Sequence, residues 1–484
     1  MLERLRVKSS CADFLPLPHR MPPNVLRARP LGGECDCGQD HEQDAAVAAA
    51  APGPPGRWQG LSWAYPKDRD KGLMATVDGW LEDRRGMDGA EGLWRVEDNL
   101  YDLTPFMERH PGGREWLELS KGMDVTELFF SHHISETAET LLPKFLVRPA
   151  TAPRNSPFTF HRDGFYMQLR ERARKALEAT PKQVLRAAEQ RSKNIVDALA
   201  VSTLLACFLA ALLGSYLVGT AAGLLLSVTC SGAHNFSHQR HNWRRYYFEL
   251  GFMSSREWMV SHAMSHHVFP NTLQDLEVTF FEPLVAFLPY PHKNLAVRYL
   301  SWGYCAVVYA ALSHGQFVKR LQSLSLRWSD AVSLAVPAAM LLSGAPLLEV
   351  WLMWTWVLVV SSLYFGLQGL SAGHHHPHNY HEGDALGADD YGLMQIAATG
   401  NCTGLRGRDS LLFSLTHFGD HRLHHLFPTV DQAVLPFLES AFTDHMAQYR
   451  ISAPSMSTWE AVRGKYLQMA RRTPNPRPPG DSNH

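Results

Sequence analysis

Eight histidines stand in three short blocks of a chain that also contains several long apolar stretches. Each block contains two histidines four residues apart, and on a helix such a pair projects from one face, where both rings can reach a shared cation. The pattern predicts a metal centre in or beside a membrane. The predicted ligands are His234 and His238 in the first block, His262, His266 and His267 in the second, and His421, His424 and His425 in the third.

The composition favours metal binding and argues against nucleic acid as a partner. The 484 residues include 25 histidines, most of them in a few short tracts, which is typical of metal-binding segments. The chain has 46 Lys and Arg residues against 47 Asp and Glu residues, so no overall field would attract nucleic acid. The seven cysteines are scattered, some of them within apolar stretches, so we expect the soluble parts to face a reducing compartment.

Shifts in composition divide the chain into six segments. The run AAVAAAAPGPPG belongs to a leader that would bury too little apolar surface to fold alone, and PATAPRNSP indicates a Pro-rich linker. We expect a disordered leader over 1–65, a globular domain over 66–148, a linker over 149–160, a basic amphipathic juxtamembrane helix over 161–194, a membrane domain over 195–455 and a C-terminal tail over 456–484.

The longest uncharged stretch runs from Ala198 to Ala233. At about 1.5 Å per residue these positions would make roughly 54 Å of helix, too much for one crossing of a roughly 30 Å hydrocarbon core. We therefore expect two spans, with a turn near Gly214 or Gly219. Such a hairpin returns the chain to the cytoplasmic side at His234, because basic residues precede and follow it.

The third histidine block can join the first two only if an even number of crossings separates them. We expect the first of the three intervening apolar stretches to lie at the membrane interface, because polar and basic residues interrupt and flank it. The other two would form a hairpin joined at Gly344 and Pro346. The three stretches are 299–318, 331–345 and 350–371.

The run YDLTPFMERHPGG, residues 101–113, followed by DVTELF, resembles the cytochrome b5 haem-binding domain. That resemblance implies an α+β domain in which two axial histidines hold haem b, an arrangement without an open iron position that suits electron transfer. His110 matches the first ligand. We assign the second to His133, which keeps the following ISETAETL helix nearest to its expected register, with His132 as the alternative.

The three blocks resemble the histidine boxes of the membrane fatty acid desaturase and hydroxylase superfamily over roughly 195–450. The resemblance implies an all-α, multi-span membrane domain with two non-haem iron ions at its cytoplasmic face, and no catalytic residues beyond the iron ligands. The segment LSAGH, residues 370–374, resembles a further motif of the family and makes His374 a ninth ligand. Leu370 stands where the family has Asn, which puts a water-mediated contact in doubt.

Other polar residues near the blocks have two interpretations each. Acids and amides could orient the ligand rings, or could be ordinary solvated groups and helix caps. The neighbouring histidines are expected to orient ligands or to lie at the surface. The candidates to orient ligands are Asn271, Asp275, Glu277, Asp384 and Asp420, and the neighbouring histidines are His375, His376, His378, His381 and His417.

Together the two parts resemble the cytochrome b5-related proteins. The resemblance implies an oxidoreductase of the endoplasmic reticulum membrane, with its haem domain and histidine boxes cytoplasmic. An NADH-dependent cytochrome b5 reductase would reduce the haem, which would pass electrons across a flexible linker to the irons. With O2, the irons would desaturate an acyl-lipid or acyl-CoA substrate. Front-end desaturases have Gln where this chain has His421, so no regiochemistry follows.

Two alternatives remain open at the level of sequence. The same ligand set would serve a hydroxylase, which adds oxygen to the acyl chain instead of removing hydrogen. A member of another class, a membrane-anchored haem electron carrier without oxidase activity, would need no functional boxes. Full retention of the eight box histidines argues against the carrier.

Overall fold

The computed structural model describes residues 76–479, apart from 240–241, 370–372 and 404–408. The predicted leader, Leu370 and Ser371 lie outside the described residues. The described helices are α1 Val77–Met87, α2 Arg114–Ser120, α3 Thr126–His132, α4 Thr137–Leu141, α5 Phe165–Ala179, α6 Lys182–Leu213, α7 Tyr216–His234, α8 Ser255–Trp258, α9 Leu276–Thr279, α10 Ser301–Ala310, α11 Leu312–Gln322, α12 Ala335–Leu341, α13 Leu347–Gly369, α14 Tyr391–Ala398, α15 Leu411–Thr416, α16 His421–Leu426, α17 Glu439–Gln448 and α18 Thr458–Ala470.

Three strands and several 3-10 or π segments complete these elements. The strands are β1 Trp94–Val96, β2 Asn99–Tyr101 and β3 Leu146–Pro149. The other segments are η1 Thr104–Arg109, η2 Leu142–Phe145, η3 Trp243–Gly251, η4 Met259–His266, η5 Ala296–Leu300, η6 Trp328–Leu334 and η7 Leu435–Leu438.

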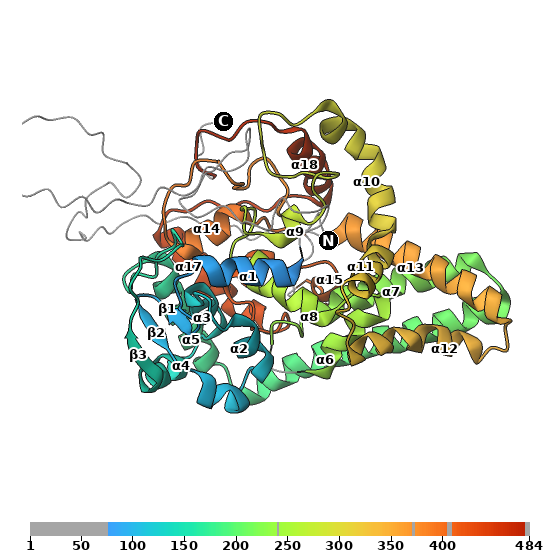
Figure 1. Ribbon diagram of the computed structural model, residues 1–484, viewed down its shortest axis with the longest axis horizontal. Coiled ribbons are helices and arrows are strands. Elements are labelled where there is room, and N and C mark those ends of the chain that lie inside the picture. Colours follow the sequence, from blue (N-terminus) through green and yellow to red (C-terminus); the bar gives the residue numbers. More distant parts are fainter. Residues whose placement is uncertain (1–75, 240–241, 370–372, 404–408, 480–484) are drawn as a thin grey trace, which may run out of the picture. The chain divides into compact units, whose positions relative to one another are not determined.

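The N-terminal domain is built on a small antiparallel sheet in the order β1-β2-β3. Trp94 pairs with Tyr101 across the first two strands, and both side chains are buried. Helices α2, α3 and α4 belong to the same domain (Figure 1). This mixture of a short sheet and short helices confirms the α+β class expected for the haem-binding part.

The first predicted hairpin is formed by α6 and α7. Helix α6 ends at Leu213, and the positive φ of 56° at the next residue, Gly214, places it in the left-handed region, where glycine carries no steric cost. Ser215 then caps α7 by accepting a hydrogen bond from the backbone N–H of Val218. The predicted turn near Gly214 is therefore confirmed. The two helices are long and apolar enough to cross a membrane, as is α13.

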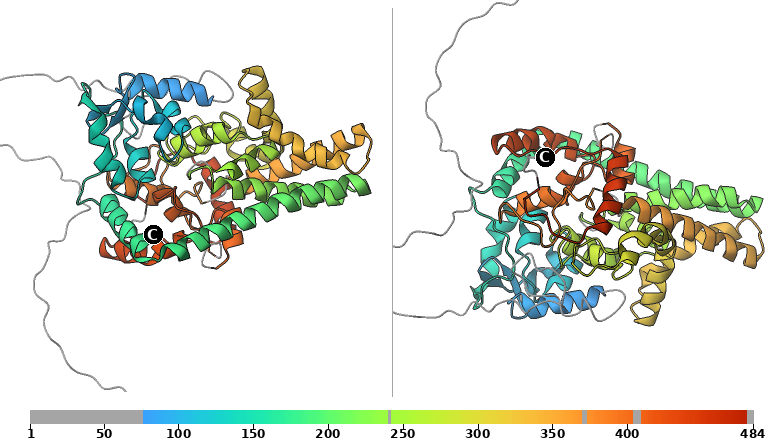
Figure 2. Two further views of the ribbon diagram at one scale, coloured as in Figure 1. Left: turned by 90° about the horizontal axis from the view of Figure 1, so that it is seen from below. Right: turned by 90° about the horizontal axis from the view of Figure 1, so that it is seen from above.

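The second predicted hairpin also forms, by α12 and α13 around Gly344, whose φ is 79°. Helices α6, α7, α12 and α13 lie side by side (Figures 1 and 2). Close packing depends on glycine, because a Cβ atom at Gly223 of α7 would stand 2.7 Å from a side-chain carbon of Val360 in α13. The apolar segment Trp328–Leu341 is shorter than the three candidate spans.

The stretch over 299–318 is helical but bent. It is divided among η5, α10 and α11, and α10 packs against α13. At the contact, the ring of Tyr309 leaves no room for a side chain at Gly366, since a Cβ atom there would meet it at 2.6 Å. Its position at a membrane interface stays a prediction.

The basic segment over 161–194 is not one helix. Helix α5 ends at Ala179 and α6 begins at Lys182, because Pro181 cannot donate the backbone hydrogen bond of a continuous helix. Phe165 and Tyr166 of α5 are buried in the core that joins the N-terminal domain to the rest. The segment therefore forms two helices where one amphipathic helix was expected, and its juxtamembrane position stays a prediction.

The linker over 149–160 connects the two predicted parts, but it is not a flexible tether. Arg154 pairs with the buried carboxylates of Asp124 and Glu127, and Phe158 is buried beside Tyr391 of α14. The backbone N–H of Thr159 donates to the carbonyl of Asp389 at 2.8 Å. The expectation of a freely moving link is wrong, and the described residues all belong to one compact unit.

The C-terminal segment is likewise part of the fold. It contains α18, in which Lys465 and Gln468 are buried. The Gln468 amide donates to the carbonyl of Phe287 at 2.7 Å, and Arg471 pairs with Asp384. The predicted tail therefore packs against the helical domain as far as the structure describes it.

Candidate metal centre

The first histidine block lies where α7 ends, so only His234 is helical and His238 stands in the turn that follows. Asp431 holds this turn in place by accepting hydrogen bonds from the amides of Asn235, at 2.8 Å, and Gln239, at 3.1 Å. Ser192 of α6 donates to the same carboxylate. One buried acid therefore ties the first block to the segment after the third.

The second block lies in a π-helix, not an α-helix. The backbone N–H of His267 donates to the carbonyl of His262, five residues earlier, at 2.8 Å. A wider turn brings residues four and five apart to one side, so His262, His266 and His267 can all face the same interior. Such π segments occur frequently at functional sites.

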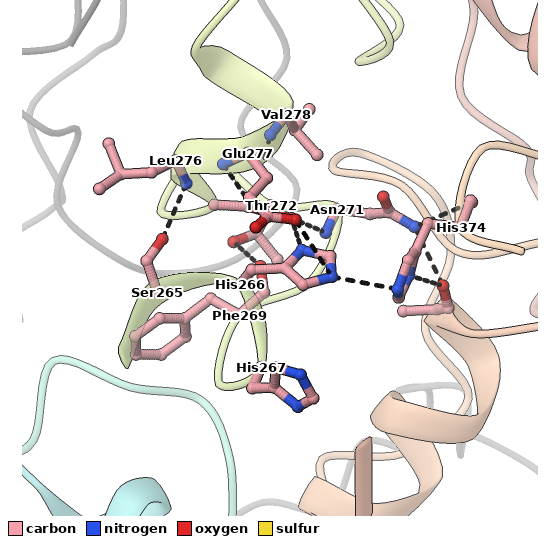
Figure 3. Close-up of polar contacts among 12 residues, drawn as sticks. Ser265, His266, His267, Phe269, Asn271, Thr272, Leu276, Glu277, Val278 and His374 are labelled. Atoms are coloured by element: carbon pink, nitrogen blue, oxygen red, sulfur yellow. Dashed lines mark hydrogen bonds and ion pairs between the residues drawn. The ribbon is translucent and has the colours of Figure 1, made fainter. Parts of the chain in front are cut away.

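The third block forms α16, and His374 approaches it from a separate loop. Arg422 of α16 is buried and donates to the carbonyl of Thr399 at 2.8 Å, which fixes the helix in register. Asn271 holds the loop of His374, because its amide donates to the carbonyls of His374 and Tyr380 at 3.2 and 3.0 Å. His266 and His374 point toward one another in Figure 3.

The nine predicted ligands converge in two neighbouring groups of buried side chains. Their facing Nε2 atoms are separated by 2.7 Å between His234 and His262, and by 3.0 Å between His266 and His374. Adjacent ligands of an octahedral ion with bonds of about 2.1 Å lie about 3 Å apart. One group is His234, His238, His262, His267 and His424, and the other is His266, His374 and His425, with His421 joined to it through a 3.0 Å contact to His374.

The hydrogen bonds around these rings fit a cation between them. The Nδ1 atom of His374 donates to the carbonyl of Ala398 at 3.0 Å, so the Nε2 atom of the neutral ring carries a lone pair. His266 is held similarly, with Nδ1 2.9 Å from Asp275. In their neutral forms the two rings would face each other lone pair to lone pair, an arrangement that a shared cation stabilises. The residues present therefore fit a metal centre.

The electrostatics differ between the rings. Burial lowers the pKa values of His238, His267 and His425 well below the ordinary value for histidine. These imidazoles are therefore neutral and able to bind a cation. Burial also acts on His266, but Asp275 and Glu277 outweigh it and raise the pKa to about 9. The same two carboxyl groups would favour a metal ion at the His266 ring.

The residues proposed to orient the ligands have mixed outcomes. Asp275 and Glu277 do contact ligand rings, at His266 and His262 respectively. Asn271 holds backbone instead of a ring, Asp384 pairs with Arg471, and Asp420 precedes α16 in a left-handed conformation. Gln395 lies in no histidine block and was not predicted, yet its side-chain oxygen accepts from His425 Nδ1 at 3.1 Å.

The remaining histidines near the blocks lie outside both groups. His375 stacks on Phe287 with ring centroids 3.7 Å apart. His376 and His378 contact each other, and His381 contacts the carbonyl of Asn379. His417 lies 3.2 Å from the hydroxyl of Tyr364. Among the described residues, these five make no part of the candidate metal groups.

An apolar cavity adjoins the second group. It is partly open to the surroundings, and its lining is mainly apolar. His262, His266, His374 and His421 stand along it. Helix α13 contributes Phe365. The main apolar lining is Phe248, Trp258, Phe280, Phe281, Leu312 and Phe365.

The haem-binding segment brings the rings of His110 and His133 opposite each other, at an interplanar angle of 65°. Their ring centroids are 6.2 Å apart, and imidazoles on opposite sides of one metal ion lie at about this separation when each metal–nitrogen bond is about 2 Å. Each Nδ1 atom contacts a backbone carbonyl, of Gly113 at 2.9 Å and Phe129 at 2.8 Å. Both Nε2 atoms are thus left for a metal, and the pair fits an axially ligated haem.

His132 points elsewhere. Its ring lies 5.2 Å from Trp116 and 6.4 Å from His238 of the first block, measured between centroids. The Nε2 atom is buried and has no hydrogen-bond partner. Of the two candidates for the second haem ligand, only His133 faces His110.

Comparison with known proteins defines the class. Residues 81–150 match the family described as Cytochrome b5-like Heme/Steroid binding domain, and residues 206–454 match the family described as Fatty acid desaturase. No solved structure matches the chain. The chain thus combines a haem domain with a desaturase-family domain, whose members are membrane proteins.

Three relatives illustrate the likeness. A cytochrome b5-related protein of Drosophila melanogaster is 38% identical over 87% of this chain and 97% of its own length. An acyl-lipid (8-3)-desaturase of Mortierella alpina is 23% identical over 78% of this chain and 92% of its own length. A Delta(5) fatty acid desaturase A of Dictyostelium discoideum is 28% identical over 36% of this chain and 40% of its own length. The chain belongs to the cytochrome b5-related proteins within the fatty acid desaturase family.

Proposed function

We propose that the chain is an oxygen-dependent fatty acyl desaturase with its electron donor built in. The observation that carries the proposal is the convergence of nine histidines in two groups beside an apolar cavity. The family supports an oxidoreductase of the desaturase class. A metal bound by these histidines would lie beside the apolar lining of this cavity.

The convergence of these side chains supports a ligand role for each of them. His110 and His133 would hold haem b, and the nine histidines of the two groups would hold two iron ions. Bound iron supplies the activation of O2 and the removal of hydrogen from an acyl methylene. Asp275 and Glu277 keep the rings of His266 and His262 oriented, while the buried surroundings exclude water from the centre.

The cavity supports an acyl chain as the substrate. Its walls are mainly aromatic and aliphatic, and histidines of the metal groups stand along it. An apolar chain in this space would pass next to His266 and His374. The substrate would be an acyl-lipid or acyl-CoA, supplied from the bilayer that α6, α7 and α13 are apolar enough to span.

The electrons would come from an NADH-dependent cytochrome b5 reductase, which reduces the haem domain. We place the protein in the endoplasmic reticulum membrane, with the haem domain and histidine boxes on the cytoplasmic side. Support for this orientation comes from the position of the first block, which follows directly on the α6–α7 hairpin at the end that faces the haem domain.

The test is lipid profiling in a desaturase-deficient host. We expect the full chain to produce acyl chains that have lost two hydrogens, and His266→Ala to abolish them. The matched control is His378→Ala, an exposed histidine from the loop that carries His374, and we expect it to keep the activity. A product that gains an oxygen atom would identify a hydroxylase. Lipids equal to those of the empty host would refute oxidation.

Iron content separates the enzyme from a simple haem carrier. The purified chain should contain non-haem iron in excess of its haem, and His266→Ala should contain less of it with unchanged haem. A chain whose iron is all haem would be an electron carrier.

A further inference from the structure

His132 lies between the two candidate metal sites, although it is a ligand in neither. It directly precedes His133, which faces His110 across the haem position. Its own ring turns to the opposite side and lies 6.4 Å from the ring of His238. Two adjacent residues therefore face two different centres.

The surroundings of His132 hold its ring in this place. The Nδ1 atom is 2.9 Å from the hydroxyl of Ser131, and the indole of Trp116 packs edge-on against the ring. The hydroxyl of Thr429, four residues after the third block, donates to the His132 carbonyl at 3.4 Å. The Nε2 atom is buried and has no hydrogen-bond partner. A hydrogen bond at that atom therefore does not explain why a histidine ring lies at this position.

We propose that His132 is the positioning residue through which electrons pass from the haem to the iron centre. The inference rests on the proposed function. In each step, ferrous haem held by His110 and His133 becomes ferric, and one ferric non-haem iron becomes ferrous. The imidazole of His132 is neutral before and after the step, and no bond to it forms or breaks.

The route is short and almost entirely covalent. It follows the His133 side chain and the peptide bond to His132, and then crosses one contact to His238 of the five-histidine group. The two ring centroids are 6.4 Å apart, so a single through-space gap separates His132 from the five-histidine group. Electron tunnelling weakens steeply with each additional gap, so a path with a single gap is favoured.

Docking of the haem domain fixes this gap. The guanidinium of Arg170 in α5 donates to the carbonyl of His133 at 2.8 Å. The hydroxyl of Tyr166 donates to the carbonyl of Leu426, next to the third block, at 3.0 Å. Trp80 donates from its indole to the carbonyl of Gln274 at 3.0 Å. These buried contacts hold both ends of the route in one rigid arrangement.

The test follows electron transfer within the full chain loaded with haem and ferric non-haem iron. A laser flash generates a flavin semiquinone under anaerobic conditions, which reduces the haem, and the decay of the ferrous haem absorbance reports internal transfer. We expect His132→Leu to slow this decay by about tenfold or more, with an unchanged low-spin haem spectrum, haem potential and iron content. The matched control is His381→Leu, which removes a buried histidine that contacts neither group.

The outcomes separate the two proposals. A His132→Leu decay less than about tenfold slower than that of the wild type would overturn the role of His132. If the wild-type chain itself shows no internal transfer, the electron route of the proposed function fails instead. Should His132→Leu not bind haem, His132→Gln gives the same test, because it keeps a polar side chain of moderate size and removes the ring.

Discussion

Asp275 offers the sharpest test of the metal centre, because one carboxylate serves two functions there. Its Oδ2 atom accepts from His266 Nδ1 at 2.9 Å and from the backbone N–H of Asn271 at 2.8 Å. Its Oδ1 atom caps α9 through the backbone N–H of Glu277 at 2.9 Å. The residue is fully buried, so water cannot replace a lost contact.

In Asp275→Asn the side chain keeps its shape but loses its charge. One oxygen becomes an NH2 group, which must face either the His266 N–H or the N–H groups that begin α9. A hydrogen bond to a charged group contributes about 1.5–3 kcal/mol, and loss of such a contact to a metal ligand typically lowers metal affinity about 10–100-fold. We expect a decrease of that size in the affinity for non-haem iron.

The assay is iron retention against a chelator series, with haem in the same chain as the internal standard. The matched control is Asp384→Asn, since Asp384 is a buried acid that pairs with Arg471 and contacts no ligand ring. We expect it to reduce stability without changing iron retention. Equal iron retention by Asp275→Asn and the wild type would refute the assigned role of Asp275.

Three further predictions concern the haem, the helix packing and the pH dependence of stability. His133→Ala should lose the low-spin absorption spectrum of a haem with two histidine ligands, whereas His132→Ala should keep it. The opposite result would identify His132 as the second haem ligand. Gly223→Val should lower the unfolding free energy by about 1–3 kcal/mol, because a Cβ atom there meets Val360 at 2.7 Å; an unchanged thermal midpoint in detergent would contradict the packing. Burial raises the pKa of Glu249 to about 7 from 4.5, so the folded state keeps this proton to higher pH than the unfolded state and wild-type stability falls as pH rises between those values. Glu249→Gln removes this loss. Its free energy of unfolding, relative to that of the wild type, should therefore rise between about pH 4.5 and about pH 8 by up to roughly 3 kcal/mol, and its thermal midpoint should rise with it. The exposed Glu178→Gln should show no such trend.

Local sequence patterns predicted the candidate metal ligands better than they predicted the residues that hold those ligands in place. The histidine spacing identified a set of side chains that the structure brings together, and the uncharged stretch around Gly214 identified the first hairpin. These signals are contained in a few neighbouring residues. The π-helix of the second block is different, because the spacing of its histidines does not distinguish a π-helical backbone from an α-helical one.

Contacts between distant segments were beyond the sequence pattern. Gln395 supports His425, and Asp431 holds the first block, yet neither residue lies within a histidine motif. The docked linker did leave a signal: PRNSPFTF contains two phenylalanines, and Phe158 and Phe160 are buried. Proline and serine suggested mobility, but the two aromatic side chains stabilise a fixed position.

The packed linker has a consequence for turnover in an enzyme of the proposed kind. Haem carries one electron at a time, whereas each desaturation consumes two from the donor. Because Arg154 and Phe158 anchor the haem domain, it cannot leave to be recharged and return. The reductase must instead visit the same docked domain twice per double bond, which makes the supply of electrons a matter of repeated encounters at an outer surface.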